Sequence, residues 1–199
     1  MESCSAWVSS SQTVPQRKFG LYGSLSQAAR YAPVGEWLAR IISSWISGDT
    51  VLPAYLGLGR PALAELMARH FPGLVLPDSC QRAHAPPDLH RAMEREAVQN
   101  LLLDNCSLSL PDAHWLARIM AEGCLGEDHL WQDLGLWSRE DLSALIHHAF
   151  APLANRNELD MKWKKFFYKQ LCAADGVSLC RAPSCDVCRD YERCFGPEE

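Results

Sequence analysis

Four cysteines within fifteen residues have the spacing of a metal-binding motif. Cys180, Cys185, Cys188 and Cys194 follow the pattern C-x4-C-x2-C-x5-C. The two-residue gap lets two sulfurs of one tight turn face a common centre, and the longer gaps allow the chain to bring in the outer two. Four thiolates suit either tetrahedral zinc or an iron–sulfur cluster. Disulfide bonds, or thiols without a ligand, are the alternative interpretation.

The spacing alone does not select the metal. Zinc sites usually pair two short cysteine turns that are well separated in sequence, whereas here one loop supplies all four thiols. A compact loop suits a cuboidal cluster, because its several metal atoms spread the ligand sulfurs apart. The loops of cluster-bearing DNA glycosylases look similar, with C-x6-C-x2-C-x5-C. Plant-type ferredoxins share the C-x4-C-x2-C part, but this sequence lacks their β-rich surroundings.

Composition and charge narrow the class of protein. The chain has 199 residues, of which 48% are hydrophobic, so it can form one domain with a buried core. A net charge of -5 disfavours a general binder of nucleic acid or membrane surfaces. No apolar run approaches the ~20 residues that span a bilayer, and Met1–Thr13 lacks the features of a signal peptide. We therefore expect a cytoplasmic protein that binds neither nucleic acid nor a membrane.

The chain contains nine cysteines, and their distribution is uneven. In a reducing compartment disulfides are rare, so clustered cysteines indicate a metal site and scattered ones indicate small core residues. The scattered cysteines are Cys4, Cys80, Cys106 and Cys124.

A helix predicted over residues 157–173 leads into the cysteine motif. One of its faces is apolar and should pack into the protein; it carries Trp163, Phe166, Phe167 and Leu171. Another face carries Lys162, Lys165 and Lys169. This lysine face is either simply solvated, or it stabilises the negative charge of a thiolate-bound cluster or of an oxyanion such as molybdate.

Two residues outside the motif are candidate accessory ligands. Cys172 lies in the last turn of the same predicted helix, where it is either a spare ligand or a small helix-end residue. His129 lies beside Leu130 and Trp131, where it is either a non-thiolate ligand or a residue that packs or caps a helix.

Apolar periodicity predicts an all-α protein, an irregular helical bundle with a C-terminal cysteine-rich metal-binding loop. Capping boxes at Ser109–Asp112 and Ser138–Asp141 each indicate the start of a helix. The helices are expected at residues 35–46, 61–71, 88–105, 109–123, 129–135, 138–150 and 157–173. We divide the chain into a weakly ordered segment (1–33), a helical domain (34–176) and a cluster-binding loop packed on that domain (177–199).

Several stretches resemble the NifQ family of nitrogen-fixation proteins over about residues 35–199. The C-terminal part is specific: Met161-Lys-Trp-Lys-Lys-Phe-Phe-Tyr168, then Leu171-Cys172, then the four-cysteine motif. His129-Leu-Trp-Gln-Asp-Leu-Gly135 and the Leu-x-x-Leu and Phe-x-Pro-Leu pattern ending at Leu153 are similar to the middle of the family. The stretch from Gly57-Leu-Gly59 to His70-Phe-Pro-Gly73 is a looser match.

The resemblance implies a function as well as a fold. NifQ proteins carry a molybdenum–iron–sulfur cluster and hand molybdenum to nitrogenase cofactor assembly, namely the nitrogenase iron protein and the NifE–NifN scaffold. Cys180, Cys185, Cys188 and Cys194 match the four cysteine positions of the family, which makes them the expected cluster ligands. The protein is then a metal and cluster donor and not an enzyme.

Other classes of protein remain as alternatives. A zinc-stabilised helical adaptor and a simple iron–sulfur electron-transfer protein both agree with the four thiols. A DNA repair glycosylase would need a helix-hairpin-helix, a catalytic Lys/Asp pair and a basic face, whereas this chain has an acidic balance and no such hairpin. No nucleophile–base pair or carboxylate dyad indicates hydrolytic catalysis.

Overall fold

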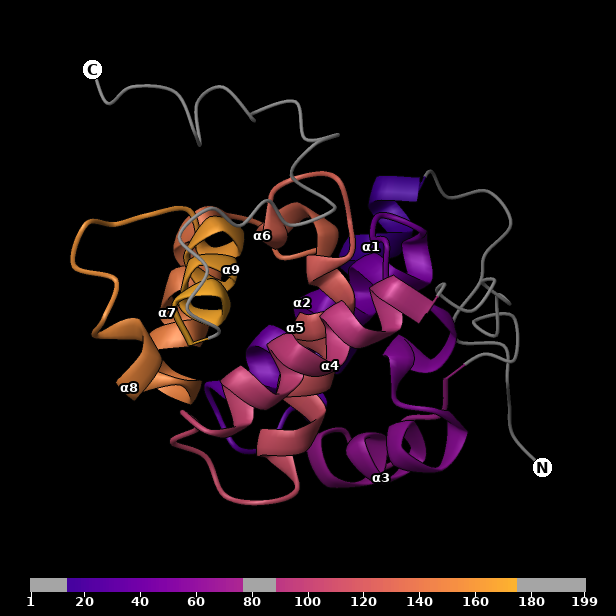
Figure 1. The fold of residues 1–199 in the computed structure, drawn as a ribbon. Helices are drawn as coiled ribbons and strands as arrows, with labels where there is room; N and C mark the ends of the chain where they lie inside the picture. Colours follow the sequence, from indigo (N-terminus) through magenta and orange to yellow (C-terminus); the bar gives the residue numbers. More distant parts are fainter. Residues whose placement is uncertain (1–13, 77–88, 175–199) are drawn as a thin grey trace.

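The computed structural model describes residues 14–76 and 89–174. Every regular element in these two ranges is helical, which confirms the all-α prediction for this part of the chain (Figure 1). The predicted cluster-binding loop, residues 177–199, lies outside the described ranges, so its placement against the helical domain stays a prediction. Within the described ranges no helix is long and apolar enough to cross a membrane.

The helices pack in pairs around two central ones, α2 and α5. Helix α1 packs on α2 and α4 packs on α5, while α9 lies against α4 at one side of the molecule (Figure 1). In chain order the elements are α1 (Val14–Ala28), α2 (Val34–Ser47), a 3-10 turn η2 (Ala54–Gly57), α3 (Arg60–His70), α4 (Leu89–Leu103), α5 (Asp112–Cys124), α6 (Leu130–Asp133), α7 (Arg139–Ala149), α8 (Ala151–Ala154) and α9 (Trp163–Ala174).

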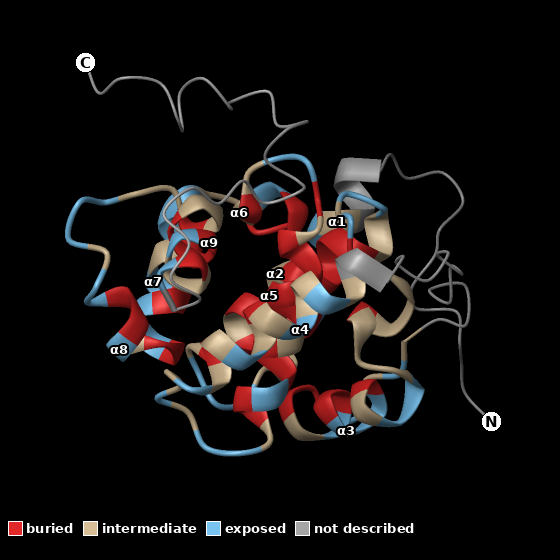
Figure 2. Cartoon of the chain, in the orientation of Figure 1, coloured by how far each residue is buried: buried red, intermediate tan, exposed pale blue. Residues whose placement is uncertain are grey.

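Helices α2 and α5 supply the centre of the hydrophobic core (Figure 2). Ile41 and Ile42 of α2 and Ile119 and Met120 of α5 are all completely buried. Burying one such side chain stabilises the folded state by roughly 1.5–3 kcal/mol. The apolar faces predicted for residues 35–46 and 109–123 are therefore confirmed.

The segment predicted to be weakly ordered, residues 1–33, contains helix α1 over residues 14–28. The sequence of this segment has a weak helical pattern, but tertiary contacts stabilise it. Leu25 is fully buried, Lys18 Nζ donates to Asp49 Oδ2 at 3.0 Å and Ser26 Oγ donates to Glu36 Oε1 at 2.8 Å. Residues 1–13 lie outside the described ranges.

Of the two predicted capping boxes, the first serine of one caps its helix and the first serine of the other does not. Ser138 Oγ accepts a hydrogen bond from the backbone N–H of Asp141 at 3.1 Å, as predicted, and α7 follows. Ser109 does not cap α5, which begins at Asp112 with Pro111 at the N-cap and no side-chain cap. The two motifs look alike in sequence, so tertiary contacts must distinguish them.

The Asp112 carboxylate pairs with side chains of α3. Arg69 donates to both of its oxygens, at 2.9 and 3.1 Å, and His70 Nε2 lies 2.9 Å from Oδ1. Burial alone would raise the pKa of Asp112, but these hydrogen bonds outweigh it and hold the pKa below its usual value. The carboxylate therefore joins α3 to α5 and does not fold back on its own helix.

Gly135 allows the turn after α6 to approach α2 closely. Its φ is +74°, and its carbonyl accepts a hydrogen bond of 2.6 Å from Ser44 Oγ. A Cβ atom at this position would lie 2.4 Å from Ser44 Cβ and 2.4 Å from Thr50 Cγ2. Both the backbone conformation and the available space therefore require glycine.

We predict that Gly135→Ala destabilises the protein by about 2–4 kcal/mol, because left-handed backbone strain adds to overpacking. Gly73→Ala is the matched control, since Gly73 also has a positive φ (83°) but nothing within 4 Å of the added Cβ. The control should lose only about 1 kcal/mol. Urea unfolding measures both values, and equal losses would contradict the close approach.

Candidate metal centre and a basic pocket at helix α9

Helix α9 joins the helical body to the four-cysteine motif. Trp163, Phe166 and Phe167 on its inner face are 5%, 2% and 0% exposed, which confirms the predicted apolar face. The Trp163 indole Nε1 also donates to Ser143 Oγ of α7 at 3.0 Å. Helix α9 packs against both α4 and α7. These contacts hold the helix in place up to its last residue, Ala174.

The predicted cluster ligands Cys180, Cys185, Cys188 and Cys194 lie outside the described residues, so their convergence on one centre stays a prediction. Of the accessory candidates, Cys172 is buried in α9, with 8% exposure. Within residues 14–76 and 89–174, no three His, Cys, Asp or Glu side chains are grouped to hold a metal ion.

The other accessory candidate, His129, stands at the N-terminal end of α6. Its backbone N–H donates to Gln132 Oε1 at 3.3 Å, and its carbonyl accepts from the Gln132 and Asp133 amides at 2.8 and 3.0 Å. These bonds favour the capping interpretation of His129, although its side chain also lines a pocket that is described below.

Two of the scattered cysteines behave as core residues. Cys106 and Cys124 carry free thiols. Cys124 is fully buried, and desolvation raises the pKa of its thiol to about 12. Burial also raises the pKa of Cys106, whose Sγ donates to the Ala149 carbonyl at 3.3 Å. Neither thiol ionises readily, so both fit the predicted role of small core residues.

Sequence reasoning missed Lys164, which ties α9 to α6. Its ammonium group forms an ion pair with the Asp133 carboxylate and donates to the carbonyls of Gly126 and Asp128 at 3.0 and 2.8 Å. Asp133 is only 2% exposed, and burial raises its pKa against the opposing effect of Lys164. The available signal was Asp133 itself, an acid within a segment that also contains Leu130, Trp131 and Leu134, because a carboxylate needs a partner when it is buried.

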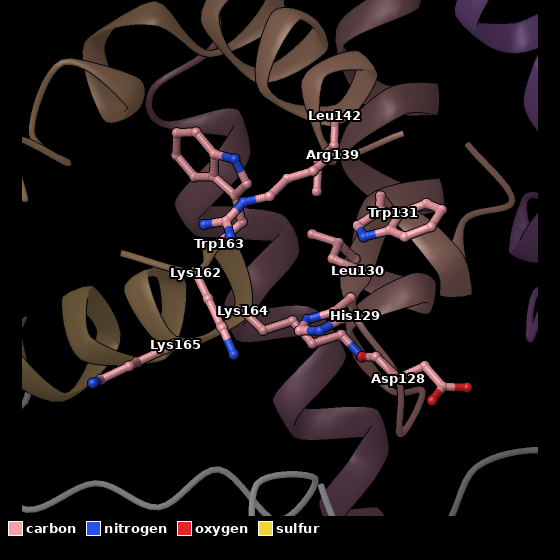
Figure 3. A pocket seen from close by; sticks show the side chains of 10 residues that line it. All are labelled: Asp128, His129, Leu130, Trp131, Arg139, Leu142, Lys162, Trp163, Lys164 and Lys165. Atoms are coloured by element: carbon pink, nitrogen blue, oxygen red, sulfur yellow. The ribbon is translucent and has the colours of Figure 1, made fainter. Parts of the chain in front are cut away.

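A pocket of about 50 Å³ opens at the first turn of α9 (Figure 3). Its walls come from three parts of the chain: the segment that enters α6, the start of α7 and the start of α9. The lining residues are Asp128, His129, Leu130, Trp131, Arg139, Leu142, Lys162, Trp163, Lys164 and Lys165. Two lysines of the predicted lysine face, Lys162 and Lys165, thus belong to a pocket, while the third, Lys169, is exposed.

The described part of the chain is helical, and a four-cysteine motif of the metal-binding type follows it in sequence. These two features define a class of helical proteins with a C-terminal cysteine motif. The family model described as NifQ matches residues 37–196, a range that includes all four motif cysteines. The chain therefore belongs to the NifQ family, whose proteins take part in nitrogen fixation.

Individual relatives agree with this assignment. The chain is 45% identical to Protein NifQ of Azotobacter vinelandii, with 88% of this chain and 95% of the relative covered. It is 42% identical to Protein NifQ of Rhodobacter capsulatus, with 83% and 89% covered. It is 35% identical to Protein NifQ of Klebsiella pneumoniae, with 82% and 99% covered. No solved structure matches the chain.

We predict that Lys164→Met destabilises the protein by about 3 kcal/mol, because it leaves the Asp133 carboxylate buried without its cation. The pKa of Asp133 should then rise further above its unfolded value. A carboxyl group with a raised folded-state pKa loses stability as pH rises through that pKa, so the destabilisation should be larger near pH 8 than near pH 5.

Lys169→Met on the exposed side of the same helix is the matched control, and its effect should stay within about 0.5 kcal/mol. Urea unfolding at the two pH values provides the measurement. A pH-independent loss in the Lys164→Met variant would contradict the buried ion pair.

Proposed function

We propose that this protein carries a molybdenum–iron–sulfur cluster on Cys180, Cys185, Cys188 and Cys194 and donates molybdenum to nitrogenase iron–molybdenum cofactor biosynthesis. One observation carries the proposal: the NifQ match extends to residue 196 and so includes the complete C-x4-C-x2-C-x5-C motif. The cluster is cargo, and the protein is a donor and not an enzyme. Its receivers are the NifE–NifN scaffold and the nitrogenase iron protein.

The donor set agrees with this cargo. Thiolates and sulfides are soft ligands that suit iron, and sulfide also binds reduced molybdenum well. Four cysteines hold an iron–sulfur core, and a labile corner of that core takes and releases molybdenum. Cys172 and His129 remain candidate accessory ligands in this proposal.

The helical body has a defined part in the proposal, which is to present the motif to its partners. Cys180 follows Ala174, the last residue of α9, by six positions. Six residues span at most roughly 20 Å when extended. The first cluster ligand is therefore tethered closely to a helix that is fixed by buried aromatic residues and by Lys164.

The zinc-stabilised adaptor is the second candidate, because four closely spaced thiols also fit a tetrahedral zinc site. Anaerobic purification separates the two candidates. A brown protein with iron and molybdenum supports the cluster carrier, whereas a colourless protein with stoichiometric zinc supports the adaptor.

We predict that Cys188→Ala lowers the iron and molybdenum content per chain several-fold and abolishes molybdenum transfer, because a cluster that has lost one thiolate ligand is held less tightly. The measurement is elemental analysis of anaerobically purified protein, followed by cofactor assembly in a reconstituted system that contains the scaffold and the iron protein.

Cys106→Ala is the matched control, since it removes a half-buried thiol outside the motif. Its metal content should equal that of the unsubstituted protein. Unchanged iron and molybdenum in the Cys188→Ala variant would refute the proposed cluster site.

A further inference from the structure

Helix α9 ends with a cysteine that is already bonded to another cysteine. The described residues contain three cysteines, of which Cys106 and Cys124 carry free thiols, whereas Cys172 forms a disulfide. The partner of Cys172 therefore lies outside the described ranges. The cysteines in that part of the chain are Cys4, Cys80, Cys180, Cys185, Cys188 and Cys194.

The Cys172 side chain faces the seam between α9 and α4. It is only 8% exposed, and it lies four positions after Tyr168, so the two side chains share one face of the helix. Tyr168 is buried, and its hydroxyl donates to Glu94 Oε1 of α4. The Cα atoms of a disulfide lie roughly 4.4–6.8 Å apart, so the partner of Cys172 must return to the C-terminal end of α9.

Chain length favours Cys180 as this partner. Cys180 lies eight positions after Cys172, whereas Cys80 and Cys4 lie 92 and 168 positions before it. The entropic cost of closing a loop grows with the length of the loop, so the nearest cysteine pairs most readily. Asp175 and Gly176, directly after α9, are residues that favour a turn. Such a turn lets the chain reverse toward Cys172.

We propose that Cys172 and Cys180 form a reversible disulfide in the metal-free protein, and that this bond must be reduced before the cysteine motif accepts its metal. In a reducing compartment a disulfide is usually transient and serves redox sensing or catalysis. The consequence for metal loading rests on the proposed function, which takes Cys180 as a cluster ligand, whereas the pairing itself does not.

The opening reaction is a thiol–disulfide exchange with a dithiol reductant. One thiolate of the reductant attacks a sulfur of the bond to form a mixed disulfide, and the second thiolate of the reductant then resolves it. Two electrons and two protons pass to the protein, so that Cys172 and Cys180 become thiols and the reductant becomes a disulfide. The reverse exchange, with a disulfide such as oxidised glutathione, closes the bond.

The bond has two effects on the motif. It withdraws the Cys180 thiolate, which leaves three thiolates for a centre that is held by four. It also keeps the Cys180 sulfur in an oxidation state from which a thiol restores it, whereas a free thiol can be oxidised further to sulfinic acid, a largely irreversible product. The motif is thus closed and protected until a reductant is present.

Peptide mapping of the full-length, metal-free chain tests the pairing. The chain is incubated with oxidised glutathione, its remaining thiols are blocked with N-ethylmaleimide, and it is digested with trypsin. Cleavage after Lys169 and Arg181 releases residues 170–181, a peptide whose only cysteines are Cys172 and Cys180. We expect mass spectrometry to find this peptide unlabelled and two hydrogen atoms lighter than its reduced form. A label on Cys172, or a cross-link from Cys172 to a different peptide, would overturn the pairing.

Cobalt(II) binding tests the consequence for the motif. Samples treated with oxidised glutathione or with dithiothreitol are desalted and titrated with cobalt(II) alone, whose thiolate complexes are coloured. The oxidised chain should bind several-fold less cobalt than the reduced chain. In the Cys172→Ala variant the two treatments should give equal binding, because Cys180 has lost its partner. Each variant is compared only with itself, so a role of Cys172 as an accessory ligand does not affect the result.

Cys106→Ala is the matched control, since it removes a thiol that is free in the structure, and it should respond to oxidation as the unsubstituted chain does. Equal cobalt binding by the oxidised and the reduced unsubstituted chain would overturn the inference, and so would the same loss of binding on oxidation in Cys172→Ala. Neither measurement uses iron or molybdenum. A chain that purifies anaerobically without these metals but shows the pairing therefore rejects only the proposed function.

Discussion

The contact between Lys164 and Asp133 is the interaction on which the functional end of the molecule depends. A buried carboxylate is costly unless a cation and hydrogen bonds compensate it, and here one lysine provides both, since it also bonds two loop carbonyls. The pair fixes the first turn of α9 against α6. The same contact thus holds together two walls of the pocket at the start of α9 and fixes the helix that precedes the cysteine motif in sequence.

Local signals in the sequence predicted the helices better than their ends. Ser138 caps α7 because its hydroxyl needs only the amide three residues later. Helix α9, by contrast, begins at Trp163 and not near Asn157 as predicted, because the Asn157 side chain bonds the backbone N–H and C=O of Met161, each at 2.9 Å. Helix α1 was not predicted, because its own apolar pattern is weak and contacts with α2 stabilise it.

The cysteine motif and the pocket at the start of α9 also differ in how far the sequence predicts them. The cysteine motif is contiguous, so its spacing alone indicates a metal centre, and it also carries the family resemblance. The pocket at the start of α9 brings together residues near 128, 139 and 162, and no local pattern shows that these segments meet. Sequence reasoning found Lys162 and Lys165 as one face of a helix, but Arg139 joins them only through tertiary structure.

The place of the cysteine motif in the chain has a further consequence for how a metal carrier would work. A carrier must bind its cargo firmly and still release it. In the proposed function, sulfur ligands that follow α9 in sequence hold the soft metal centre. Helix α9 itself is held separately, by its buried aromatic residues and by the ion pair of Lys164 with Asp133. A change of metal ligands during transfer would therefore leave the contacts that hold α9 intact.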